Sequence, residues 1–189
     1  MNYVSDYIAD ENLFSSFNDL ANKTFSLDFS TWKKAGCYDG SYVPHSFAQD
    51  GKIIANVSVT KVDMMINHKF VRAIQIGTVV TDASFRGQGL SRKLIEVVLK
   101  EYSSADLFYL FANDSVLDFY PKFGFHPSDE FLYCNDNLLE FKNISGARSL
   151  NRRKSEDIDI LKDILSKRVF LSQIFGIKGA VSIPLWHFL

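Results

Sequence analysis

The sequence is poor in cysteine, in net charge and in long apolar runs. Its 189 residues include only Cys37 and Cys134, and 21 basic side chains nearly balance 22 acidic ones. Two distant cysteines are too few for a zinc cluster or a disulfide framework, and they suit a reducing compartment. The net charge of −1 gives no electrostatic basis for binding nucleic acid or an acidic membrane surface.

No stretch approaches the roughly 18 to 20 apolar residues that a membrane-spanning helix needs. The first residues, MNYVSDYIADENLFSSF, carry early acidic side chains and lack the basic start and apolar core of a signal peptide. We therefore expect a cytoplasmic protein without a membrane or nucleic-acid partner. Because no group of His, Cys, Asp and Glu shows ligand spacing, we also expect no metal.

Hydrophobic residues make up 47% of the chain, which includes 17 Phe and 8 Tyr. This composition supports one sizeable domain with a packed core, or one domain with an appendage. The aromatic residues are not interleaved with a basic stripe, so they indicate a core and a pocket and not a surface that stacks bases.

Residues 74–100, IQIGTVVTDASFRGQGLSRKLIEVVLK, predict a buried strand, a glycine turn and an amphipathic helix in direct succession. Gly77 inside the strand indicates a bulge or a close backbone approach. Gly87 and Gly89 let the turn expose backbone N–H groups, and the first helical turn adds unpaired donors and the positive end of the helix dipole. The turn is therefore an anion site, and with Arg86 beside it phosphate is the expected anion.

The turn lacks the lysine and Ser/Thr of a P-loop and the three glycines of a dinucleotide fingerprint, which disfavours a nucleotide triphosphatase. Its order of strand, R-G-Q-G-L-S and helix resembles the acetyl-coenzyme A motif of the GNAT superfamily of N-acetyltransferases, (Q/R)-x-x-G-x-(G/A). Arg86 and Gly89 match the fixed positions, while Ser91 stands where the family usually has Gly or Ala. The resemblance implies that pantetheine is bound by backbone groups of Val79, Val80 and Thr81, and pyrophosphate by the amides of Arg86, Gly87, Gln88, Gly89, Leu90 and Ser91.

A second stretch, NDSVLDFYPKFGF at residues 113–125, follows an expected strand over residues 106–111. It resembles the second coenzyme segment of the same family, a short helix ending in F-Y-x-x-x-G-F. The resemblance implies that Asn113 bonds the pantetheine arm where two parallel strands diverge, and that Tyr120 lies near the coenzyme sulfur. A phenol there can give a proton to the departing thiolate as a general acid.

The first quarter of the chain predicts a short strand over residues 3–8 and a helix over residues 11–25 with Asp10 as its N-cap. Ser30 is expected to cap a short helix around Trp32. In the family this region forms part of the acceptor wall, so Trp32, Tyr38 and Tyr42 are candidates for substrate binding, with ordinary packing as the alternative.

Strands are expected over residues 42–49 and 52–64, joined by the hairpin signal Asp50-Gly51, and a turn near Asn67-His68 leads into a strand over residues 69–81. Together with a final strand near residues 131–139, this order predicts a mixed α/β sheet. An antiparallel meander precedes a parallel pair at the coenzyme site, helices flank the sheet, and the ligand crevice lies at the carboxyl ends of the central strands.

The composition shifts beyond residue 140. We therefore expect a GNAT acetyltransferase domain over residues 1–140 and a helical, apolar extension over residues 141–189, with a helix over residues 157–168. The apolar tail must be covered by the domain, by a partner subunit or by further sequence, so a homodimer is a reasonable expectation. The tail also resembles the start of an additional subdomain in larger bacterial GNAT proteins, which would make this chain a shortened member.

These features predict direct transfer of the acetyl group of acetyl-coenzyme A to a primary amine of a small molecule or peptide, without an acyl-enzyme. The amine must first lose a proton. Gln75 on the coenzyme strand cannot act as a base, and Asp63, Asp82, His45 and His126 are alternatives of which none is assigned. A non-catalytic acyl-coenzyme A sensor and a transferase of longer acyl chains are the competing hypotheses.

Overall fold

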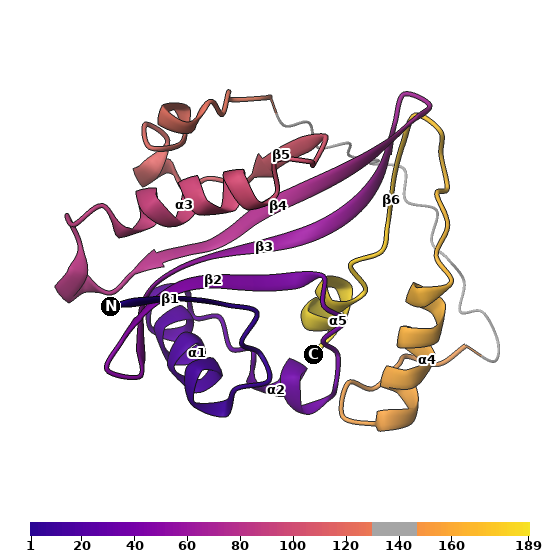
Figure 1. The fold of residues 1–189 in the computed structure, drawn as a ribbon. Helices are drawn as coiled ribbons and strands as arrows, with labels where there is room; N and C mark the ends of the chain where they lie inside the picture. Colours follow the sequence, from indigo (N-terminus) through magenta and orange to yellow (C-terminus); the bar gives the residue numbers. More distant parts are fainter. Residues whose placement is uncertain (130–146) are drawn as a thin grey trace.

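The computed structural model describes residues 1–129 and 147–189, which form a six-stranded mixed sheet with helices on both faces (Figure 1). Only β4 and β5 run parallel, and the other described neighbours are antiparallel. The predicted mixed α/β class, the meander and the parallel pair are therefore confirmed. The sheet follows the order β1 (Asn2–Ser5), β2 (Tyr42–Gln49), β3 (Lys52–Ile66), β4 (Lys69–Thr81) and β5 (Leu107–Leu110), and β6 (Phe175–Lys178) pairs with the end of β3.

Two tight turns set the register of the meander. Asp50 and Gly51 have φ angles of +51° and +75°, and Asn67 and His68 have φ angles of +47° and +64°. Two successive left-handed residues match the right-handed twist of the flanking strands, so short hairpins form at both predicted positions. The first strand is shorter than expected and ends at Ser5.

Two helices from the start of the chain cover one face of the sheet, and α3 (Leu90–Glu101) covers the other (Figure 1). In α1 (Glu11–Phe25) the Asp10 carboxylate accepts the N–H groups of Asn12 and Leu13 at 3.0 Å each, which confirms the predicted cap. The predicted Ser30 cap of α2 (Ser30–Lys34) is wrong. Ser30 is the first helical residue, and its N–H donates to the Asp28 carboxylate at 2.8 Å.

The alternation of side chains along β3 sorts the residues between the two faces of the sheet. Val57 and Val59 pack with the buried face of α3, which consists of Leu90, Leu94, Ile95 and Val98. The intervening Asn56 and Ser58 point to the face that carries α1 and are fully buried there. Polar side chains therefore lie beneath α1, where they must be hydrogen-bonded.

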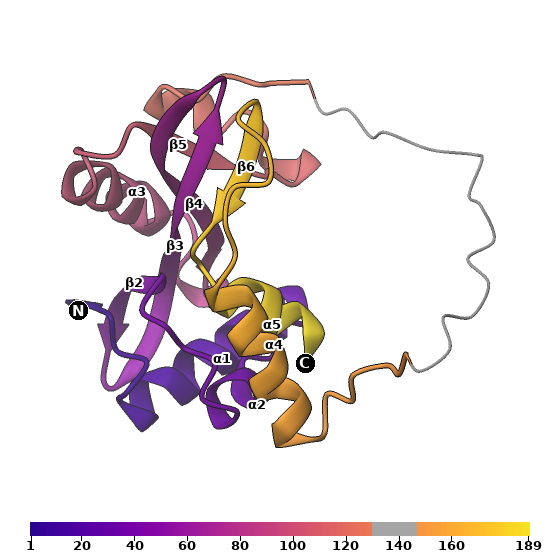
Figure 2. The same cartoon turned by 90° about the vertical axis from the view of Figure 1, so that its right-hand side faces the viewer.

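The C-terminal residues fold back onto the same face as α1 and α2, as Figure 2 shows for α4 (Ser155–Ser166) and α5 (Ser182–Phe188). Leu185 is buried in the core that contains Phe29 and Trp32, and β6 extends the sheet. The domain itself thus covers the part of the tail around α5, whereas the tail also keeps exposed apolar side chains, namely Val169, Leu171, Ile174, Phe175 and Ile177. The expected dimer therefore stays a prediction. The predicted boundary at residue 140 and the strand near residues 131–139 lie outside the described residues.

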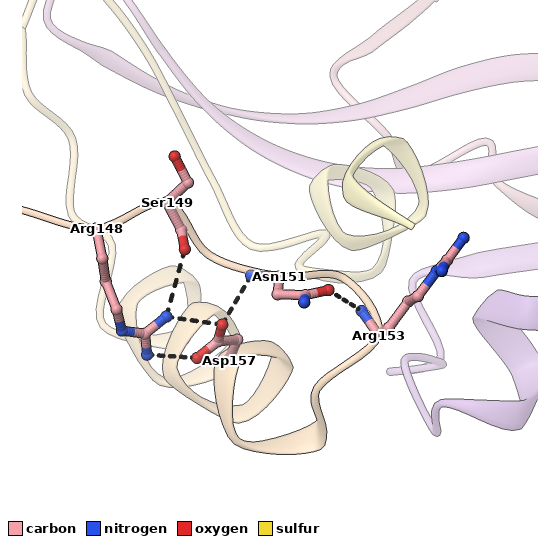
Figure 3. Close-up of polar contacts among 5 residues, drawn as sticks. All are labelled: Arg148, Ser149, Asn151, Arg153 and Asp157. Carbon is pink, nitrogen blue, oxygen red and sulfur yellow. Dashed lines mark hydrogen bonds and ion pairs between the residues drawn. The ribbon is translucent and has the colours of Figure 1, made fainter.

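The start of α4 is anchored by an ion pair (Figure 3). Asp157 is 1% exposed and accepts both terminal nitrogens of Arg148, at 2.8 and 2.5 Å, and the Asn151 N–H at 2.7 Å. These donors lower the pKa of Asp157 to about 2, with Arg148 as the largest contributor. The position in the first turn also places its negative charge at the positive end of the helix.

In the described part of the chain, no helix is long and apolar enough to cross a bilayer.

Candidate coenzyme and transfer site

The parallel strands β4 and β5 diverge at the centre of the sheet. They pair from Ala73 opposite Leu107 to Ile76 opposite Leu110, where β5 ends while β4 continues to Thr81. From Gly77 onward, this edge of β4 has no neighbouring strand among the described residues. Ligand crevices form at such points because backbone N–H and C=O groups become available there.

The bulge indicated by Gly77 lies at this point. Ser58 pairs with Gly77 and Asn56 with Val80, so that Thr78 and Val79 face the single residue Val57. Thr78 has a φ angle of +48°. A β-branched residue in the left-handed region is a true outlier that costs on the order of 1–3 kcal/mol, and such strain persists only where the surroundings enforce it.

The glycine turn has the geometry that an anion site requires. Gly87 and Gly89 have φ angles of +78° and +72°, and no side chain of the described residues caps the N-terminus of α3. The first amides of the helix are therefore open to a ligand. Arg86 Nε lies 3.4 Å from the Thr81 carbonyl oxygen, and the hydroxyl groups of Thr81 and Ser91 are 2.7 Å apart. Ser91, the departure from the family motif, thus ties the helix to the end of β4.

A cleft of about 900 Å³ joins the diverging strands, the bulge and the glycine turn. It brings together all the residues predicted to bind coenzyme or to act as the acid except Gln88, namely Val79, Val80, Thr81, Arg86, Gly87, Gly89, Leu90, Ser91, Asn113 and Tyr120. Its charged lining residues in the described part of the chain are Arg86 and Arg92. The cleft therefore favours an anionic ligand.

Tyr120 lies in the cleft wall formed by the second predicted coenzyme segment. This segment forms two 3₁₀ turns, Asp114–Val116 and Tyr120–Phe123, where one short helix was expected. Pro121 inside it cannot donate a backbone hydrogen bond, which disfavours a continuous helix. Tyr120 is 8% exposed and packs edge-on against Phe119 and Phe125. Burial raises the pKa of Tyr120, so its hydroxyl stays protonated at neutral pH.

The three aromatic residues predicted to bind the acceptor do not line the cleft. Trp32 is 2% exposed and its Nε1 donates to the Ser182 carbonyl at 3.1 Å, while the Tyr38 hydroxyl bonds to Asp6. Tyr42 is also buried, but its hydroxyl lies 3.0 Å from Thr78 Oγ1 at the bulge. Of the three, Tyr42 is the one whose hydroxyl reaches a residue of the cleft.

None of the four residues considered as a base lines the cleft. His45 is fully buried between the hydroxyls of Tyr3 and Tyr102, and burial lowers its pKa. Asp82 accepts the Ser84 N–H at 2.9 Å, which lowers its pKa and makes it a turn cap. Asp63 pairs with Arg72 toward the opposite end of β3, and His126 is exposed. Among the described residues, no group of three His, Cys, Asp or Glu is placed to hold a metal ion.

Sequence reasoning missed the contribution of α1 and the loop after it, because Thr24, Phe25 and Leu27 reach the cleft only through tertiary packing. It also missed Arg92, one residue beyond the motif, where the charge next to the helix start was the available signal. The left-handed backbone conformation of Thr78 had one signal in the sequence, the neighbouring Gly77.

The chain is similar to known acetyltransferases in sequence profile and in fold. Residues 14–128 match the family model for the acetyltransferase (GNAT) domain. No curated protein matches the chain in sequence. Among solved structures, glucosamine-6-phosphate N-acetyltransferase from Arabidopsis thaliana superposes with a TM-score of 0.54 at 21% identity, over 72% of this chain and 100% of that one.

Two further structures show the same fold. A predicted acetyltransferase from Clostridium acetobutylicum, solved with acetyl-coenzyme A, has a TM-score of 0.55 at 18% identity, over 71% of this chain and 95% of its own. An aminoglycoside acetyltransferase from an uncultured soil metagenomic sample has a TM-score of 0.56 at 16% identity, over 73% and 96%. Since the family model spans more than half of the sequence and the cleft carries the motif residues, this chain belongs to the GNAT family of acetyltransferases.

Proposed function

We propose that this acyltransferase is an N-acetyltransferase that passes the acetyl group of acetyl-coenzyme A directly to a primary amine. The observation that carries the proposal is the single cleft in which three features meet. These are the N-terminus of α3, the bulged edge of β4 beyond its pairing with β5, and the Tyr120 side chain. Each feature serves a different part of an acyl-coenzyme A molecule.

The chemistry of the cleft fits this ligand. The amides of residues 86–91 would hold the pyrophosphate, supported by the positive charge of Arg86. The backbone of residues 79–81 and the side chain of Asn113 would hold the pantetheine arm. No Asp or Glu among the described residues lines the cleft, so no described carboxylate in its wall opposes the phosphates. Acetyl-coenzyme A would supply the acetyl group already activated as a thioester.

Tyr120 would act as a proton donor at the reacting end of the cleft. Because its pKa is raised, the phenol is protonated throughout the neutral range and can serve as an acid but not as a base. The amine must lose a proton elsewhere, and no described Asp, Glu or His lines the cleft to take it. The base therefore stays unassigned, and transfer of this proton through ordered water is allowed.

The acceptor is proposed only as a class. Structural neighbours include enzymes named for glucosamine-6-phosphate and for aminoglycosides, both of which offer amines. At 16–21% identity these neighbours support the fold alone. The class proposed for the acceptor, a primary amine of a small molecule or peptide, therefore comes from the sequence motifs and the cleft. Cytoplasmic location and dimer formation stay predictions from the sequence.

A thermal melt with acetyl-coenzyme A, desulfo-coenzyme A and ATP tests the coenzyme site. A ligand at about 100 times its dissociation constant stabilises the native protein by roughly 2.7 kcal/mol. We expect a clear shift with both coenzyme A forms and little with ATP, followed by thiol release when a panel of amines is added. No shift with either coenzyme A form would contradict the proposal.

The absence of a described base in the cleft favours one competing function, a non-catalytic acyl-coenzyme A sensor. A sensor would show the melt shift but no thiol release with any amine. It would also tolerate Tyr120→Phe without loss of function. Preference for longer thioesters in the same melts would indicate a different acyl donor.

A further inference from the structure

A chain of buried hydrogen bonds crosses the sheet beneath α1 and ends at the bulge. The Tyr7 hydroxyl lies 2.6 Å from Ser46 Oγ, and Ser46 Oγ donates to Asn56 Oδ1 at 2.8 Å. Asn56 Nδ2 then donates to Ser58 Oγ at 2.9 Å and to the Thr78 carbonyl oxygen at 2.8 Å. Ser46, Asn56 and Ser58 are fully buried.

This network has a defined direction. Since Ser46 gives its proton to Asn56, the Tyr7 hydroxyl must be the donor to Ser46. The Asn56 amide oxygen is thereby fixed toward Ser46, which leaves its amide nitrogen pointing toward β4. Both hydrogens of that nitrogen are used, one by Ser58 and one by the Thr78 carbonyl. The side chain of Asn56 is therefore held in one orientation.

The bond from Asn56 also orients the next amide. In a planar trans peptide the C=O and the following N–H point in opposite directions, and the described chain has no cis peptide. Because the Thr78 carbonyl points to Asn56 on β3, the Val79 N–H points away from β3. That direction is the edge of β4 beyond its pairing with β5, where Val79 lines the cleft.

Thr78 does not hold this arrangement by itself. Its left-handed backbone is disfavoured for a β-branched residue. Two buried side chains hold it by hydrogen bonds: Asn56 donates to the Thr78 carbonyl oxygen, and the Tyr42 hydroxyl lies 3.0 Å from Thr78 Oγ1. Rotation of the peptide between Thr78 and Val79 would turn a carbonyl oxygen toward the cleft in place of the N–H. Such a rotation would repel an acyl oxygen that the N–H would otherwise attract.

We propose that Asn56 is a positioning residue that aims the Val79 N–H into the cleft at the carbonyl oxygen of the bound thioester. The inference rests on the proposed function, because it needs an acyl-coenzyme A in the cleft. Asn56 itself does not line the cleft and acts through the bulge. The N–H would stabilise charge that develops on that oxygen during transfer.

Asn56→Leu tests the proposal, because leucine has a similar size and no hydrogen-bonding group. Tyr42→Phe removes only the hydroxyl group that contacts Thr78 Oγ1. This variant is the second test, for the case that the leucine variant does not fold. The matched control is Ser182→Ala, which also removes a fully buried hydroxyl, bonded to Ser41 at 2.7 Å, outside the cleft.

Three measurements are made on each protein: calorimetric affinity for acetyl-coenzyme A and for coenzyme A, the Val79 amide signal in ¹⁵N-valine spectra, and kcat. A hydrogen bond from Val79 to the thioester should give the wild type a roughly two- to tenfold preference for the acetylated form. Asn56→Leu should lose this preference and the acetyl-dependent shift of the Val79 signal while keeping its affinity for coenzyme A. Its kcat should fall by about tenfold or more. The loss should stay smaller than the roughly 10²–10³-fold loss caused by removing a hydrogen-bond donor to the oxyanion altogether.

Tyr42→Phe should show the same changes with a smaller loss of kcat, and Ser182→Ala should show none of them. Wild-type kcat and selectivity in Asn56→Leu would overturn the positioning role of Asn56. If Tyr42→Phe alone folds, the same result in that variant would overturn the inference that the side chains holding Thr78 direct the Val79 N–H. Equal loss of affinity for both coenzyme A forms would overturn it too, because that pattern means a general loss of structure. If the wild-type protein binds neither acetyl-coenzyme A nor coenzyme A, the proposed function is wrong, and this inference fails with it.

Discussion

Replacing Gly89 by alanine separates the backbone role of this glycine from its role in the proposed anion site. Gly89 has a φ angle of +72°, and a Cβ atom added to it would meet no protein atom within 4 Å. The protein leaves room for the methyl group, so only the left-handed backbone opposes it, at about 1–2 kcal/mol. In a chain of this length, such a loss lowers the melting temperature by roughly 2–8 °C.

Ligand binding should lose more than folding does. The methyl group would occupy space beside the open amides of α3, where we place the pyrophosphate. Losing one hydrogen bond to a charged group costs about 1.5–3 kcal/mol, or roughly ten- to a hundredfold in Kd. With acetyl-coenzyme A at about 100 times the wild-type Kd, ligand stabilisation should fall from about 2.7 kcal/mol to about 1.4 kcal/mol for tenfold weaker binding and about 0.4 kcal/mol for hundredfold.

Gly51→Ala is the matched control. Gly51 has a φ angle of +75° and equally open surroundings, but it lies in the β2–β3 hairpin outside the cleft. Thermal melts of both variants without ligand should show the same loss of stability. With acetyl-coenzyme A, only Gly89→Ala should show a smaller ligand-induced shift than the wild type. Equal ligand shifts in the two variants would refute the assignment of the anion site to the start of α3.

Three further predictions concern the proposed acid, the α4 ion pair and the aromatic core. Tyr120→Phe should lower kcat by roughly 10²–10⁴ and leave the acetyl-coenzyme A melt shift unchanged, and an unchanged kcat would remove Tyr120 as the acid. Because the folded-state pKa of Asp157 is about 2, below the unfolded value near 3.9, its stabilisation is complete above about pH 4 and is lost as the pH falls toward 2. Urea midpoints of wild type and Asp157→Asn should therefore converge over that range, and a constant difference would contradict the role of the Arg148 pair. Trp32→Phe should lower the free energy of unfolding by about 1–3 kcal/mol through loss of the bond to Ser182, without changing the KM for the amine, whereas a raised KM would return Trp32 to the acceptor site.

Much of the fold was predictable because its elements depend on short-range physics. Three such features are the Asp10 cap, the two left-handed hairpin turns and the apolar face of α3. Within each feature, the residues that interact are only a few positions apart in the sequence. Where two local partners compete, this reasoning was less secure. Ser30 was expected to cap α2, but Asp28, two residues earlier, accepts the Ser30 N–H with a carboxylate.

That the residues proposed to bind coenzyme lie together was predictable for the same reason. Residues 86–91 form one continuous turn, and Val79–Thr81 directly precede it, so their proximity follows from the covalent chain. The sequence could not predict whether Trp32, Tyr38 and Tyr42 lie in the cleft or in the core, because an aromatic side chain suits both environments equally well. Trp32 packs against the rings of Phe29, Tyr38 and Tyr42, and its Nε1 donates to the Ser182 carbonyl of α5, 150 residues later.

By itself, the sequence determined the order of elements, the family and the glycine turn before α3, since these follow from periodicity, glycine and charge over short stretches. Only the tertiary structure decided that Thr78 adopts a left-handed conformation, that Asn56 of the neighbouring strand holds its carbonyl, and that α1 and the loop after it help form the cleft wall. Those features depend on strand register and on contacts between distant segments, which no local pattern encodes.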